Sequence, residues 1–107
     1  MKLNPTTLSW KAPTTNVDGT PIDYELEYEV GADDGKAYVP LMTIPGQLRQ
    51  NENYEAPISD LLLDYGEHTI ALRSFDKSMP DRMSEWSEPV TFTLATVPSR
   101  PLELRVT

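Results

Sequence analysis

TTLSWKAP, residues Thr6–Pro13, decides the fold of this chain. Apolar and polar side chains alternate up to the large aromatic Trp10, and Pro13 then ends the pattern. Successive side chains of a β-strand point to opposite faces, so this alternation predicts a strand with one buried face. A tryptophan on that face indicates the core of a β-sandwich, and the proline indicates a turn where the strand leaves it.

Short alternating segments separated by turn residues continue along the chain. Ten prolines and five glycines interrupt it, and no long segment has a helical period. We therefore predict an all-β fold, an antiparallel two-sheet sandwich of about seven strands. Pro40 and Pro57 place their strands at sheet edges, because proline donates no hydrogen bond to a neighbouring strand. Residues Lys77–Glu85 are expected to form a loop. Six of the expected strands are Thr6–Trp10, Ile22–Val30, Tyr38–Ile44, Tyr54–Ile58, His68–Phe75 and Val90–Leu94.

Ile22–Val30 has the clearest two-residue period. One face carries aromatic and aliphatic side chains, and the other carries Glu25, Glu27 and Glu29. This acidic row is interpreted as a solvated face or as a patch for a basic protein partner. Acid–base catalysis is not expected, since an open strand face offers no cleft that would shift the pKa values of the carboxylates.

The character of the chain changes after Ala95. Val97–Pro101 contains two prolines, which favour extended backbone, and Leu102, Leu104 and Val106 then alternate with polar residues. The sequence therefore predicts a sandwich domain over residues 1–95, whose first strand is short or missing. It predicts a proline-rich linker and an extended C-terminal arm over residues 96–107.

Four segments, taken in order, resemble a fibronectin type III module. Leu8–Trp10 resembles the second strand of that family, and Tyr24–Tyr28 resembles the third strand with its spaced tyrosines. Leu61 with Gly66–Ser74 resembles the turn into the sixth strand, and Ser84–Val90 resembles the start of the last strand. The resemblance implies an immunoglobulin-like antiparallel sandwich of about seven strands.

The chain departs from this family at two places. The family usually has a tyrosine where His68 stands, hydrogen-bonded back across the corner; either Tyr65 takes over that bond or the corner is rebuilt. The family also has a first strand ahead of the segment that holds Trp10, where this chain has Met1–Pro5. The tail Pro98–Thr107 resembles such a first strand with its leading prolines.

Three interpretations of the tail stay open. It begins a second module, it folds back to supply an edge strand to its own domain, or it completes the sandwich of a neighbouring subunit or another protein. An uncovered sheet edge favours the third, because its backbone donors and acceptors can bind an added strand. The residues expected to contact other subunits are Pro98, Pro101, Leu102, Leu104 and Val106, together with the acidic row.

Met83–Ser87 resembles the Trp-Ser-x-Trp-Ser box of cytokine-receptor modules, with Met83 in place of the first tryptophan. Arginines stack between aromatic rings in that box. The resemblance implies a structural cation–π contact in which Arg73 or Arg82 lies over Trp86.

Composition argues against several classes of protein. Nine Lys and Arg against 17 Asp and Glu give a formal charge of −8, which disfavours binding to nucleic acid or anionic membranes. The absence of cysteine excludes disulfides and thiolate metal sites. His68 is the only histidine and is expected in the core or at a corner, not in a catalytic relay or a zinc site. We expect no catalytic residues, cofactor, metal or membrane insertion.

The sequence therefore predicts a non-enzymatic structural or binding module. Modules resembling this family serve as spacers and adhesive decorations, and bacteriophages carry them on capsid, tail and fibre proteins. Because Met1–Pro5 contains no apolar signal region, we expect a small virion component that contacts neighbouring subunits as a homo-oligomer or on a larger particle. The alternative is a spacer or accessory adhesion module of a larger secreted or cell-surface protein.

Overall fold

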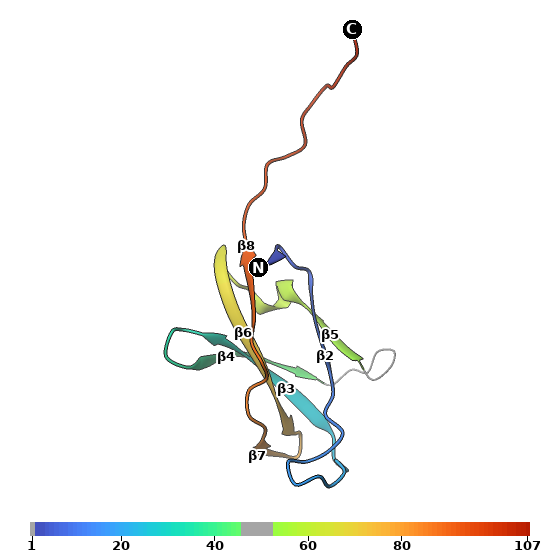
Figure 1. The fold of residues 1–107 in the computed structure, drawn as a ribbon, viewed down its shortest axis with the longest axis vertical. Helices are drawn as coiled ribbons and strands as arrows, with labels where there is room; N and C mark the ends of the chain where they lie inside the picture. The colour runs from blue at the N-terminus through green and yellow to red at the C-terminus, as the bar shows by residue number, and fades with distance from the viewer. Residues whose placement is uncertain (1, 46–52) are drawn as a thin grey trace.

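The computed structural model describes residues 2–45 and 53–107. These residues form an all-β fold with one short 3-10 turn, η2, over Ile58–Leu61 (Figure 1). The strands are β1 (Lys2–Leu3), β2 (Thr7–Lys11), β3 (Leu26–Asp33), β4 (Tyr38–Pro45), β5 (Asn53–Pro57), β6 (Gly66–Asp76), β7 (Met79–Met83) and β8 (Val90–Leu94).

The described strands form two sheets that face each other. The larger sheet has the order β1-β8-β6-β3-β4, with β7 also paired to β6, and the smaller sheet contains β2 and β5. The pairings are antiparallel except that of β1 with β8, so the larger sheet is mixed. The prediction of a purely antiparallel sandwich is therefore wrong at β1. The chain bends at Asn4, whose φ is 49° and whose side-chain amide bonds both the N–H and the C=O of Ala95.

The core lies between these two sheets. Tyr28, Val30 and Ile70 of the larger sheet are almost completely buried, at 2%, 0% and 1% exposure. Leu8 and Trp10 of the smaller sheet pack against this cluster, whereas the residues that alternate with them in β2 are exposed. The alternation in the first strand therefore correctly predicted which face is buried, since side chains two apart in a strand share a face.

The edge positions expected from the prolines are confirmed. β4, which contains Pro40, is the last strand of its sheet, and β5, which contains Pro57, borders β2 alone. The register skips Leu41, because Val30 pairs with Met42 and the next residue pairs with Pro40. This bulge accommodates the proline at the edge without a lost ladder bond in the sheet interior.

The strand predicted over Ile22–Val30 begins only at Leu26. Tyr24 lies before it in a loop, where its hydroxyl donates to Asn16 Oδ1 and its ring is covered by the Arg82 guanidinium at 4.0 Å. Tyr24 is therefore half-buried by side-chain contacts with Asn16 and with Arg82 of β7, and not by pairing within a strand.

The loop predicted over Lys77–Glu85 contains β7. All five residues of β7 are exposed, so no alternation marks the strand in the sequence. Its hairpin is closed by Asp76, whose carboxylate accepts hydrogen bonds from the Ser78 N–H at 2.9 Å and the Ser78 hydroxyl at 2.8 Å. A side chain therefore stabilises a turn that hydropathy does not reveal.

The corner before β6 is rebuilt around His68. The Nε2 atom of His68 lies 2.7 Å from the backbone oxygen of Asp64, four residues upstream, and the imidazole packs against Phe92. Tyr65 is 72% exposed. Of the two alternatives left open for this corner, the structure shows the rebuilt one, because His68 itself contacts the backbone oxygen upstream.

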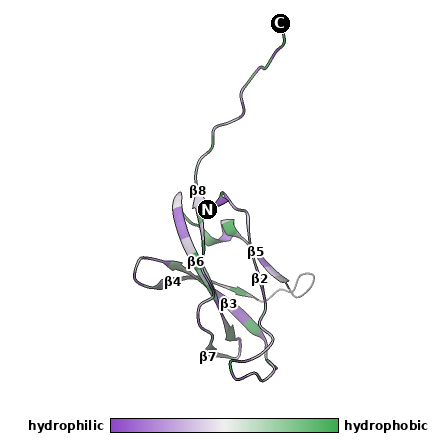
Figure 2. Cartoon of the chain, viewed as in Figure 1, coloured by the Kyte–Doolittle hydropathy of each residue, from purple (hydrophilic) through white to green (hydrophobic). Residues whose placement is uncertain are grey.

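The chain leaves the domain after β8. Residues 96–107 are exposed and form no strand, and they extend away from the sheets as a single segment (Figure 2). The overall extents of 70 × 35 × 20 Å reflect this projection. The alternating segment Leu102–Val106 thus has no sheet partner among the described residues.

Candidate interaction site

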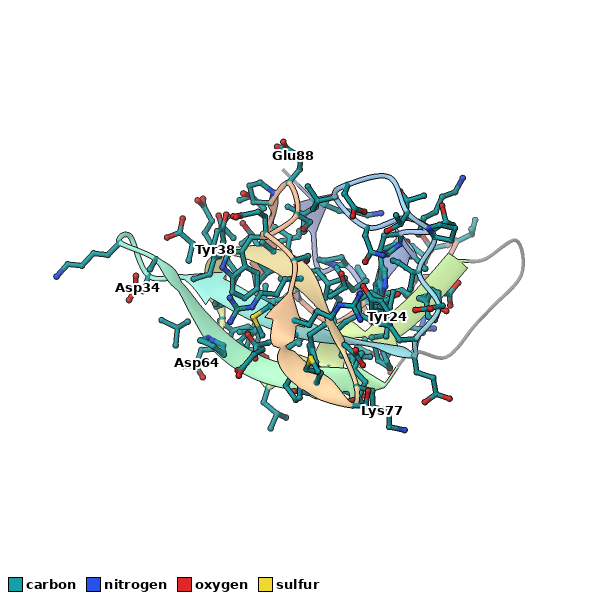
Figure 3. All side chains as sticks on the ribbon, turned by 90° about the horizontal axis from the view of Figure 1, so that it is seen from below. Tyr24, Asp34, Tyr38, Asp64, Lys77 and Glu88 are labelled. Atoms are coloured by element: carbon teal, nitrogen blue, oxygen red, sulfur yellow. The ribbon has the colours of Figure 1, made fainter. Side chains whose placement is uncertain are left out.

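A groove of about 390 Å³ opens beside β2. One wall is formed by Leu8–Lys11, the other by the segment Ser84–Glu88 that leads into β8, and Tyr28 and Ile70 line the space between them. Its surface is mostly apolar. Glu88 stands at the rim and points away from the body of the domain (Figure 3). The groove therefore combines an apolar interior with a polar border, as interaction sites commonly do.

The groove runs along an open sheet edge. β2 pairs with β5 on one side, and no described strand pairs with it on the other. The Ile58 N–H donates to the Thr6 oxygen at 3.0 Å, so the backbone groups of Thr6, and of every second residue after it, face β5. Alternate residues of an antiparallel strand turn their backbone groups toward and away from a given partner. The backbone groups of Thr7, Ser9 and Lys11 therefore face the open side.

Trp10 forms the aromatic part of the groove. Its indole stacks on Tyr54 with centroids 6.1 Å apart and meets Tyr28 edge-on at 5.1 Å. Trp10 Nε1 and Tyr28 Oη are buried, and neither makes a hydrogen bond within the described residues. Burial is the main cause of the raised pKa of Tyr28; Tyr54 adds to it, and the nearby Trp10 indole opposes it.

Two serines hold the opposite wall of the groove against β6. The Ser84 hydroxyl accepts from the Ser74 N–H at 2.9 Å, and the Ser87 hydroxyl accepts from the Leu72 N–H at 3.0 Å. The N–H groups of the same two serines donate to the Ser74 and Leu72 oxygens at 2.8 and 2.7 Å. Each serine thus exchanges two hydrogen bonds with one residue of β6, as a paired strand residue does, but accepts with its hydroxyl in place of its backbone oxygen. Sequence reasoning missed this role, although the repeated serine spacing in Ser84–Ser87 was the available signal.

Trp86 projects from this wall over β3 and β6. The Arg73 guanidinium lies 4.1 Å from its ring centroid and forms an ion pair with Glu29. Of the two arginines considered for the cation–π contact, Arg73 makes it, and Arg82 covers Tyr24 instead. The contact is worth about 0.5–2 kcal/mol and fixes the position of the indole.

The acidic row is not the uniform solvated face that the alternation predicted. Glu29 is mostly buried beside Arg73, with 19% of its side chain exposed. Glu27 is half-buried, and Glu25 lies before β3 with Lys77 at 3.6 Å. Opposite charges on neighbouring segments, Arg73 and Lys77, therefore neutralise part of the row.

The C-terminal arm places its apolar residues in solvent, away from the groove. Leu102, Leu104 and Val106 are 84%, 96% and 100% exposed. Pro98 and Pro101 are exposed as well. The structure therefore brings none of these five residues into contact with the groove of the same chain.

No cluster of three metal-ligating side chains occurs within residues 2–45 and 53–107. Over the same residues, no helix is long and apolar enough to cross a membrane. The imidazole of His68 contacts a backbone oxygen and Phe92, not a nucleophilic side chain. In comparisons with known proteins, no family model, no curated protein and no solved structure matches this chain.

Proposed function

We propose that this chain is a non-enzymatic structural and binding module with a fibronectin type III-like fold, which joins neighbouring protein subunits through its C-terminal arm. The observation that carries the proposal is the exposure of Leu102, Leu104 and Val106 on a segment that extends from the domain. Alternating apolar residues at this level of exposure favour burial against another protein surface.

The strand arrangement supports the fold assigned in this proposal. A smaller sheet carrying Trp10 packs on a larger one, and the tryptophan lies between them. His68 makes a corner bond to a backbone oxygen four residues upstream, as the corner tyrosine of such sandwiches does. The strand-like serine pairs at Ser84 and Ser87 fit the start of the last strand.

Burial of the arm supplies the driving force. Full burial of each of the three apolar side chains contributes roughly 1.5–3 kcal/mol, before the costs of ordering the arm and of association. Extended backbone favoured by Pro98 and Pro101 reduces the ordering cost, because fewer conformations are lost. The arm is therefore suited to bind as a strand and not as a helix.

The setting we propose is a particle built from many protein copies, such as the capsid, tail or fibre of a virion. Repeated subunits supply both the donor and the acceptor of each contact at high local concentration. The formal charge of −8 supports protein partners over nucleic acid. A spacer role within a larger secreted or surface protein is the alternative, and an in-frame catalytic domain beside this one would favour it.

The test is light scattering on the full chain and on the chain that ends at Val97, across a range of concentrations. The arm contributes no residue to the core, so the shortened chain keeps the domain intact. We expect the full chain to associate and the shortened chain to stay monomeric. Leu104→Asp should act like the truncation, whereas Ser99→Asp, with the same added charge, should not. Equal assembly of the full and shortened chains would overturn the proposal.

A further inference from the structure

We infer that the C-terminal arm of one copy pairs with the open edge of β2 in the next copy, so that the chains assemble head to tail. This inference rests on the proposed function and names the acceptor of the arm. The acceptor is the groove beside β2, together with the backbone groups of Thr7, Ser9 and Lys11 that face it. Addition of a strand to such an edge provides backbone hydrogen bonds, and the groove receives alternate side chains.

The direction of the strands favours a neighbouring copy over the same chain. The Asn4 N–H donates to the Thr93 oxygen at 2.8 Å, so the chain enters β2 beside the C-terminal end of β8. From there β2 runs in the direction opposite to β8 and to the arm that follows β8 (Figure 1). A strand antiparallel to β2 must run in the direction in which the arm leaves its domain. The arm of a neighbouring copy stacked end to end reaches the β2 edge while running in that direction. The chain's own arm leaves the domain beyond β2, so it would have to turn back along the domain and then turn again before it could pair in this way.

One register satisfies both the groove and the charges. With Leu104 beside Trp10, every second residue of the arm points into the groove, and Glu103 then lies beside Lys11 on the outer face. Opposite charges at directly paired positions stabilise a sheet. A shift of two residues in one direction places Arg105 beside Lys11, which pairs like charges. A shift in the other direction places Pro101 there, which has no N–H to donate.

The arm must straighten to pair in this way. Glu103 has a φ of 54°, in the left-handed region that is unfavourable for a residue with a Cβ, and its carboxylate lies 3.7 Å from Arg105. Pairing with β2 would move Glu103 into the β region and exchange Arg105 for Lys11 as its partner.

Disulfide trapping tests this contact, because the chain contains no cysteine of its own. A Lys11→Cys chain is mixed with a Glu103→Cys chain under mild oxidation, and each chain is also oxidised alone. We expect the mixed product to form at least about tenfold faster than with Thr43→Cys, an exposed position on the other edge strand β4. Mixed chains report only contacts between copies.

Charge reversal tests the register. Lys11→Glu should weaken association roughly fivefold, and the double variant Lys11→Glu/Glu103→Lys should restore it, since the pair is re-formed with its charges exchanged. Each variant's melting temperature at a dilution where the chain is monomeric should match that of the parent. Failure of the double variant to recover would overturn the register.

The outcomes separate this inference from the proposed function. If truncation at Val97 abolishes assembly but Glu103→Cys crosslinks to Thr43→Cys as well as to Lys11→Cys, the arm joins subunits and the β2 edge is not its acceptor. An arm that folds back on its own domain gives no mixed product and also overturns the inference. If the full chain is monomeric at every concentration, both proposals are wrong. Assembly that grows with concentration beyond a dimer supports the head-to-tail contact, because such contacts leave a free arm and a free β2 edge at the two ends unless a ring closes.

Discussion

Gly31 lies against the indole ring of Trp86. A Cβ atom at Gly31 would lie 2.6 Å from Cη2 and 3.0 Å from Cζ3 of that ring. Carbon atoms that are not bonded do not approach so closely, so Trp86 can occupy this site only because position 31 has no side chain. The indole is also held from its face by Arg73 and therefore has little freedom to move aside.

Gly31→Ala is therefore expected to destabilise the domain. The added methyl group must displace the indole or the strand, and overpacking of this kind costs about 1–3 kcal/mol. Urea denaturation measures the change in the free energy of unfolding. In a strand without such a contact, replacing glycine by alanine stabilises the fold by about 0.5–1 kcal/mol, because alanine loses less backbone entropy on folding. A loss of stability here would therefore be opposite in sign to the usual effect.

The same substitution in a Trp86→Ala background is the matched control. Removal of the ring leaves the Tyr38 Cβ, at 3.0 Å, as the remaining close neighbour. The cost of Gly31→Ala should then fall to at most about 1 kcal/mol, and the difference between the two backgrounds measures the clash directly. Equal costs in both backgrounds would show that the indole does not restrict this position.

His68→Ala is expected to lower stability by about 1–3 kcal/mol, because it removes the corner bond and leaves the Asp64 oxygen without its imidazole partner. Tyr65→Ala is the control from the same corner; at 72% exposure its loss should change stability by less than about 0.5 kcal/mol. Thermal melts of the two variants decide between the two corner residues. A larger loss of stability in Tyr65→Ala than in His68→Ala would show that the tyrosine, and not the histidine, stabilises this corner.

Asp76 is expected to make the stability of the domain depend on acid. The hydrogen bonds from the Ser78 side chain, and then its N–H, are the main reason that the pKa of Asp76 lies below its usual value of 3.8, and Arg82 adds to the effect. A carboxyl whose pKa is lower in the folded state stabilises the protein above the unfolded pKa. That contribution is lost as the pH falls through the folded value.

Unfolding of Asp76→Asn should therefore be compared with that of the parent from pH 7 downward. We expect the parent to be more stable at neutral pH and the gap to narrow below about pH 3.8, as the parent's carboxyl becomes protonated. Asp81→Asn, at an exposed position in β7, is the control for the change in net charge. A gap that stays constant down to pH 2 would contradict the assigned role.

Half-buried strands could be predicted from the sequence because burial imposes their alternation. Val90–Leu94 was predicted with the bounds that β8 has, and His68–Phe75 lies within β6. β7 could not be predicted, since its residues are all exposed and Pro80 interrupts it. The alternation of Ile22–Val30 misled at its start, because Tyr24 lies outside any strand and is half-buried by Asn16 and by Arg82 of β7.

Only part of the candidate site could be predicted from the sequence. The arm's apolar residues are visible in the sequence, since an alternating segment after two prolines needs no tertiary information. The open edge of β2 is not, because it depends on which distant strands pair with Thr7–Lys11. The serine bonds of Ser84 and Ser87 to β6 likewise join residues that the sequence separates by 10 and 15 positions.

Trp10 belongs both to the core and to the groove. Its substitution tests how much it contributes to the core. Trp10→Ala should cost roughly 3–5 kcal/mol, a large part of the 5–15 kcal/mol typical of a whole domain, because it opens a cavity against Tyr28 and Tyr54. Trp10→Phe keeps an aromatic ring on the same face and should cost less. Urea denaturation gives both values, and near-ultraviolet circular dichroism should show that the phenylalanine variant keeps its packed tyrosines. If Trp10→Ala costs no more than about 0.5 kcal/mol, as an exposed residue would, the indole is not part of the core.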